Sequence, residues 1–162
     1  MSTLIVLGYK NVDTAKDVYH KVLSLDKDYI VTLQSIAVVT RDAKGKFHVV
    51  TPGHEVGAST LWGLFWGVLF GVVLFIPVVG AALGAGVGAI AGAIVKHGVD
   101  KDFQEKVRSL LMTDDDSAVF MVIDGATEDK FLTALEPFGG DVLKTSLSFE
   151  DEEGLKVMLS EV

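Results

Sequence analysis

The chain has few side chains that could carry out chemistry, and none has the spacing of an active site. It contains no cysteine, so disulfides, thiolate metal sites and thiol nucleophiles are excluded. The serine and threonine hydroxyls have no obvious paired base, and no two carboxylates are placed for acid–base work in an identifiable cleft. We therefore expect no enzymatic activity and no cofactor, and the sequence identifies no small-molecule substrate.

The four histidines are the remaining candidates for a metal site. His20 lies on an amphipathic helical pattern and is expected on the surface. His48 and His54 could converge near His97, at the base of the apolar segment described below. Glu55 could join them, but no HxxxH spacing or similar ligand pattern supports a metal there. We expect no metal and interpret these residues as the rim of a headgroup or oligomer boundary.

The acidic run and the glycine-rich run do not match known motifs for binding cations or phosphate. The three aspartates at 114–116 cannot all face one cation without a calcium-type loop around them, so we interpret them as a solvated turn. No Lys-Ser or Lys-Thr follows the Gly-rich run at 84–88, which argues against a phosphate-binding loop. The net charge is −8, and residues 96–162 hold 16 acidic and 7 basic side chains. We therefore expect no nucleic-acid partner.

Outside a central apolar stretch, strand and helix patterns alternate. Continuous apolar or β-branched runs predict strands, and apolar residues at helical spacing after Asn11, Asp100 and Thr127 predict capped helices. Ser148 resembles the start of a capping box for a last helix. The predicted strands are 4–7, 29–40, 47–50, 118–123 and 142–147, and the helices are 12–25, 100–112, 127–136 and one after 148.

These elements predict an α+β protein with a ferredoxin-like βαββαβ sandwich and an insertion. If strand 47–50, the apolar stretch and helix 100–112 are set aside, the remaining order is strand, helix, strand, strand, helix, strand. That fold places its first and third strands in the middle of the sheet, and here those are the two continuous apolar runs. The predicted domain comprises residues 1–51 and 99–162, with an inserted helical hairpin at 56–97.

The inserted segment carries no charge from residue 56 to residue 95. Pro77 lies near its middle and predicts the turn of a hairpin whose arms are each about 28 Å long, barely enough for a bilayer core of about 30 Å. Glycines recur at every fourth position, so each arm has one side-chain-poor face for close helix packing. The packing residues are Gly63, Gly67 and Gly71 on the first arm and Gly80, Gly84, Gly88 and Gly92 on the second.

Residues at the ends of the arms suggest a membrane interface. Trp62 and Trp66 lie near the start of the first arm, where an aromatic belt would form, although packing in a core explains them equally well. Lys96 and His97 follow the second arm, and Arg41 precedes the first, so positive charge lies on the side that holds both termini. We therefore expect a cytoplasmic α/β domain.

Several segments resemble the bacterial family called domain of unknown function 1269, whose members are often described as membrane proteins. The resemblance is most specific in residues 117–122 and 138–148 (FGGDVLKTSLS), which an acidic helix follows. The opening at 4–8, the hairpin at 37–46 and the glycine-rich centre are also similar. The resemblance implies no activity or catalytic residue, and its similarity to glycine-zipper stress proteins implies envelope or stress association only by analogy.

An enzyme or small-ligand carrier that uses a ferredoxin-like dimer cleft is disfavoured, because the polar side chains of such a site are missing. Two interpretations of function remain. The first is a membrane-associated, non-enzymatic protein of the bacterial inner membrane, whose hairpins pack through their glycine faces into homo-oligomers. The second is a cytoplasmic assembly, a ring, shell or filament, in which the hairpins pack on one another without lipid. In both interpretations the partner is the protein itself, and in the first it is also the lipid bilayer.

Overall fold

Two apolar strands form the interior of a five-stranded antiparallel sheet. The computed structural model describes residues 2–50, 60–74, 99–124 and 128–147. Strand β1 (Ser2–Tyr9) is buried along its whole length. It pairs with β4 (Ser117–Asp124) in a continuous antiparallel register. The prediction that both apolar runs are strands buried on both faces is confirmed.

The other three strands extend this central pair on both sides. Strand β2 (Leu33–Arg41) pairs with β4, and the short β3 (Phe47–Val49) pairs with β2 through the hairpin predicted from the sequence. Strand β5 (Asp141–Ser146) pairs with β1. The strand order is therefore β3-β2-β4-β1-β5, and the protein is α+β as predicted.

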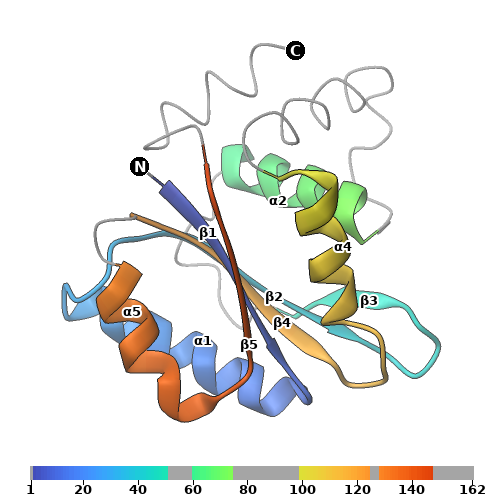
Figure 1. Ribbon diagram of the computed structural model, residues 1–162, viewed down its shortest axis with the longest axis horizontal. Helices are drawn as coiled ribbons and strands as arrows, with labels where there is room; N and C mark the ends of the chain where they lie inside the picture. The colour runs from blue at the N-terminus through green and yellow to red at the C-terminus, as the bar shows by residue number, and fades with distance from the viewer. Residues whose placement is uncertain (1, 51–59, 75–98, 125–127, 148–162) are drawn as a thin grey trace.

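Helices α1 (Val12–Lys27) and α5 (Glu128–Leu135) cover one face of this sheet (Figure 1). Helix α1 begins where expected, because the Asn11 side chain accepts a hydrogen bond from the Thr14 amide at 2.7 Å. Its apolar stripe packs against Ile5, Leu7 and the equivalent side chains of β2 and β4. The buried residues of the stripe are Ala15, Val18, Tyr19, Val22 and Leu25.

The opposite face is covered by α2 (Thr60–Val73) and α4 (Lys101–Ser109), which lie side by side (Figure 1). Helix α4 is capped by Asp100, whose carboxylate accepts a hydrogen bond from the Phe103 amide at 2.8 Å. Helix α2 is the first arm of the predicted hairpin. The structure places this helix against the sheet, in the core of the α/β domain.

The rest of the predicted hairpin, with Pro77 and the four glycines of the second arm, lies outside the described residues, as do the end of the predicted insertion and the last helix. None of the helices in the described part of the chain combines the length and the apolar character that a membrane span requires.

Strand β5 begins after a tight double-glycine turn. Helix α5 continues into a short 3-10 helix (Glu136–Phe138), and the chain then passes through Gly139 and Gly140, whose φ angles are +66° and +85°. A Cβ on Gly140 would lie 2.6 Å from the Gly8 carbonyl oxygen and 2.6 Å from Cε1 of Tyr9. Gly140 therefore lets β5 approach β1 closely at the buried Tyr9 ring.

Replacing these two glycines separates backbone strain from overlap. Gly139→Ala introduces only the strain of a positive φ, about 1–3 kcal/mol, because nothing lies within 4 Å of its Cβ. Gly140→Ala adds an overlap with backbone, which costs about 1–3 kcal/mol more. Urea unfolding should therefore give a lower free energy of unfolding for Gly140→Ala than for Gly139→Ala. Equal losses for the two variants would contradict the close approach of β5.

Candidate functional site

Helix α2 is apolar all round, and its buried side chains, as far as the structure describes them, lie on one face. Phe65, Trp66, Leu69, Phe70 and Val73 are all buried in the cluster formed with β1, β2, β4 and α4. At 100° per residue these positions form one continuous face of the helix. Phe65, Trp66 and Phe70 of the first arm therefore pack in the protein core.

Trp66 carries the most specific contact of this face. It is 8% exposed, it stacks on Phe70 with ring centres 5.5 Å apart, and both rings meet Phe120 of β4 edge-on. Its indole N–H donates to the Ser35 hydroxyl of β2 at 2.6 Å, inside the core. The structure shows Trp66 packed in the core, which is one of the two explanations that the sequence allowed for it.

The glycines of the first arm lie on a different face of α2. Gly63, Gly67 and Gly71 fall on one side of the helix, about 120° from the centre of the aromatic face. Gly67 and Gly71 are half-buried. The side chain of Trp62 and the predicted packing or rim residues Gly80, Gly84, Gly88, Gly92, Lys96 and His97 lie outside the described structure.

Two arginines donate hydrogen bonds to backbone carbonyls at the C-terminal ends of α2 and α4. The Arg108 Nε of α4 donates to the carbonyl of Val73, the last residue of α2, at 2.8 Å. The Arg41 guanidinium, at the end of β2, donates to the Leu111 carbonyl just past α4 at 3.1 Å. A cation at the carbonyl end of a helix satisfies groups that the helix leaves unpaired and opposes the negative end of its dipole.

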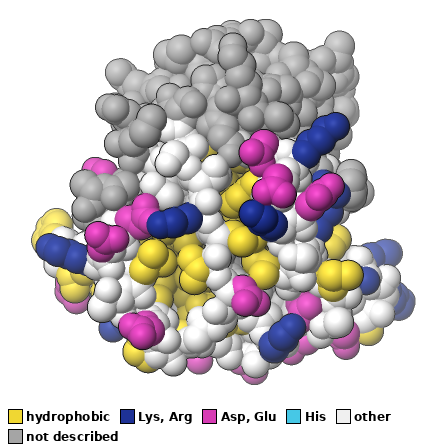
Figure 2. Space-filling view, in the orientation of Figure 1, with side chains coloured by type: hydrophobic (Ala, Val, Ile, Leu, Met, Phe, Trp, Pro, Cys, Tyr) yellow, Lys and Arg dark blue, Asp and Glu magenta, His cyan; other side chains and the backbone are white. Residues whose placement is uncertain are grey.

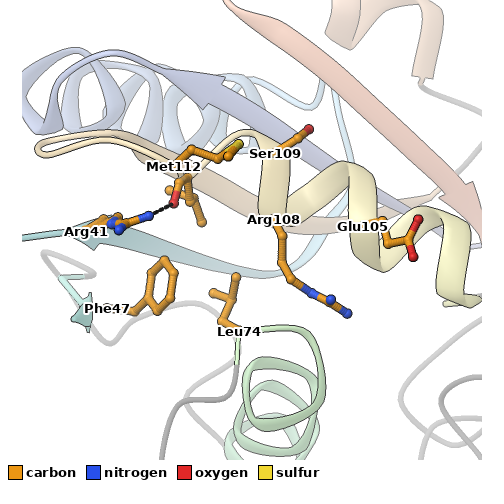
Figure 3. Close-up of a pocket in the computed structure, with 8 residues that line it drawn as sticks. Arg41, Phe47, Leu74, Glu105, Arg108, Ser109 and Met112 are labelled. Atoms are coloured by element: carbon orange, nitrogen blue, oxygen red, sulfur yellow. Dashed lines mark hydrogen bonds between the residues drawn. The ribbon is translucent and has the colours of Figure 1, made fainter. Parts of the chain in front are cut away.

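A cavity of about 430 Å³ lies between these two arginines, the β2–β3 hairpin and the end of α2. Arg41 and Arg108 flank Phe47 and Leu74, while Glu105 projects from α4 one turn before Arg108 (Figure 3). The described residues that line it are Arg41, Phe47, Leu74, Glu105, Arg108, Ser109, Leu111 and Met112. Because its lining comes from four separate segments of the chain, no sequence pattern indicates this site.

The hairpin beside the cavity is organised by Asp42. One carboxylate oxygen accepts hydrogen bonds from the Lys44 and Lys46 amides, both at 2.9 Å, and the other contacts His48 Nε2 at 2.7 Å. The bond to His48 and those to the amides lower the pKa of Asp42 to about 2. His48 of β3 is thus bonded to the turn, whereas its predicted neighbours His54, Glu55 and His97 lie outside the described residues.

The acidic turn at 114–116 differs from its prediction at one residue. Asp114 and Asp115 are exposed, as a solvated turn requires, but Asp116 is only 3% exposed. Its carboxylate accepts hydrogen bonds from the amides of Met112 and Thr113, so it closes the turn after α4. Among the described residues, no three His, Asp or Glu side chains are grouped to hold a metal ion.

Charges elsewhere on the described surface are mixed in sign. On the face in Figure 2, acidic and basic side chains are interspersed, with hydrophobic side chains between them. A basic stripe of the kind that tracks a phosphate backbone does not occur on the part of this face that the structure describes.

The family model described as Protein of unknown function (DUF1269) matches residues 60–160. The chain belongs to this family. The match begins at the first residue of α2 and includes α4, β4, α5 and β5, so the family pattern contains this helix and two of the five strands. Neither the curated proteins nor the solved structures include one that matches the chain. The family description names no activity.

The contact between Trp66 and Ser35 can be tested by a double-mutant cycle. Trp66→Phe leaves a buried hydroxyl without its donor and should cost about 1–3 kcal/mol of unfolding free energy, beyond the smaller loss of ring area. In a chain that already carries Ser35→Ala the same change should cost measurably less, because the partner is gone. Additive losses in urea unfolding would contradict the docking of α2 on β2.

The hairpin should lose its order in acid. Because the pKa of Asp42 is about 2 in the folded protein and 3.8 ordinarily, its contribution is complete above pH 3.8 and is lost as pH falls through about 2. The protection of the Lys44 and Lys46 amides from hydrogen exchange, measured relative to their intrinsic rates, should therefore fall across this window. In Asp42→Asn the protection of both amides should not change with pH in the same window, and a wild-type-like loss of protection in that variant would refute the assignment.

Proposed function

We propose that this protein is a non-enzymatic, self-associating protein whose copies pack through the glycine faces of residues 60–95. The supporting observation is the division of α2 into two faces. The sheet occupies its aromatic face, whereas Gly67 and Gly71, four residues apart, are only half-buried on another. A strip without side chains lets a second helix approach closely and gain van der Waals contact.

The proposed scaffold for this association is a ferredoxin-like domain. With β3 set aside, the sheet order is β2-β4-β1-β5 and all neighbours are antiparallel. The two helices that connect strands within this order, α1 and α5, lie on the same face. This arrangement supports the split βαβ topology, and it leaves the opposite face for α2 and α4.

The first candidate is assembly without lipid, as a ring, shell or filament in the cytoplasm. The packing of α2 favours it, because the aromatic side chains that would face acyl chains are already buried against Phe120 and its neighbours. A membrane-associated oligomer of the bacterial inner membrane, with a cytoplasmic α/β domain, is the second candidate. The uncharged sequence from residue 56 to residue 95 favours it, since the same glycine packing operates in a bilayer.

Substitutions at Gly67 and Gly71 test the glycine face directly. Alanine and leucine both raise helix propensity over glycine by about 0.8–1 kcal/mol, so neither weakens α2 as a helix. An alanine adds only a methyl group to the glycine face, so a second helix can still approach closely. A leucine side chain is large enough to keep the backbone of the partner helix away. Gly67→Leu and Gly71→Leu should therefore shift the protein toward monomers, and the alanine variants should not.

Light scattering and sedimentation, with and without detergent, provide the measurement. A large particle that forms without lipid or detergent identifies assembly in solution, and a protein that leaves the pellet only with detergent identifies membrane association. Circular dichroism of each leucine variant checks that the α/β domain is still folded. A wild-type monomer after gentle lysis, or leucine variants that assemble normally, would overturn the proposal.

A further inference from the structure

The cavity between the β2–β3 hairpin and α4 has walls suited to a hydrocarbon chain. Leu74 and Leu111 form buried parts of its lining, and Phe47 is half-buried beside them. Met112 is 64% exposed, although it is a large apolar side chain. The volume of about 430 Å³ falls within the range of about 300–1,000 Å³ that is typical of small-ligand sites.

The charge beside these walls is positive. Arg41 and Arg108 both line the cavity, and Glu105 is the one carboxylate among the described lining residues. Two other carboxylates nearby are engaged elsewhere. Asp42 binds its own turn and His48, and Asp116 binds two backbone amides. Neither of them makes an ion pair with Arg41 within the described part of the chain.

Arg41 has hydrogen-bonding capacity left for a ligand. A guanidinium carries five N–H donors in one plane, and within the described residues the Arg41 side chain makes a single hydrogen bond, to the Leu111 carbonyl. The edge of a guanidinium matches the two oxygens of a carboxylate. Arg108, which already binds the Val73 carbonyl, adds a second positive charge.

These features select for a molecule with two unlike ends. A ligand that is polar throughout would lose hydration against Phe47, Leu74 and Leu111 without compensation. A purely apolar ligand would cover the Arg41 guanidinium without supplying an anion to pair with it. An alkyl chain that ends in an acid satisfies both the walls and the charge.

We propose that this cavity binds a free, single-chain alkyl carboxylate, of the fatty-acid class, with its head at Arg41 and its chain along Phe47 and Leu74. This binding does not depend on self-association, because all the residues that carry it lie in one copy of the chain. The protein would then be a carrier or sensor of such acids.

Equilibrium dialysis of the full-length protein with labelled octanoate tests the proposal, whatever the size of the assembly. Unlabelled octanoate should displace the label, and octanol should do so about tenfold less well, because it lacks the charge that Arg41 pairs. No retention of octanoate, or equal displacement by octanol, would overturn it. If the protein bound to vesicles that contain phosphatidylglycerol but did not retain free octanoate, the proposal would also be overturned.

Matched variants locate the site. Met112→Glu places a negative charge at the rim and removes little packing, because the side chain is largely exposed, so octanoate should bind about tenfold more weakly. Thr113→Glu adds the same charge at the next exposed residue, which does not line the cavity, and should change binding little. Glu105→Gln should strengthen binding. Equal effects of the two added glutamates would show that the site lies elsewhere and would refute the proposal.

Discussion

The architecture depends on one constraint, which is that the central strands are apolar on both faces. Side chains alternate along a strand, so Ile5 and Leu7 of β1 point to one side of the sheet while Leu4 and Val6 point to the other. All four are buried. Burying a large apolar side chain contributes about 1.5–3 kcal/mol, so neither face of this sheet is stable in contact with water. Both faces must therefore be covered by helices.

This constraint explains why α2 lies on the sheet. Helices α1 and α5 cover one face, and the nine-residue α4 covers part of the other. Helix α2 supplies the remaining cover with its aromatic face. The hydrogen bonds from Trp66 to Ser35 and from Arg108 to Val73 then fix the position of α2, because each pairs a group whose burial or helix-end location demands a partner.

The sequence predicted the elements better than their contacts. Helices α1 and α4 were predicted because Asn11 and Asp100 are efficient caps and because apolar residues recur on one stripe. Helix α2 has no such stripe, since nearly all of its residues are apolar or glycine, so no periodicity indicates which face is buried. Its orientation depends on tertiary partners such as Ser35 and Phe120, which are distant in sequence.

Residues of the same type have different roles in the structure, and their spacing in the sequence does not predict which role each one has. Three adjacent aspartates look equivalent in the sequence, yet only Asp116 is buried. The backbone turns at Asp115, whose φ is +67°, and directs the next carboxylate toward the amides that follow α4. The cavity was missed for a related reason: Arg41, Phe47 and Leu74 become neighbours only after the hairpin and α2 have packed.

The same packing links any membrane form of the protein to the integrity of its sheet. For α2 to enter a bilayer, Trp66 must leave Ser35, and the apolar side chains of β1 and β4 on that face lose their cover. Their exposure to water opposes insertion, unless another segment or another copy of the chain takes the place of α2. Insertion and sheet stability are thus opposing equilibria. Association through the glycine face avoids this conflict, because Gly67 and Gly71 lie on a side of α2 that the aromatic contact with the sheet does not use.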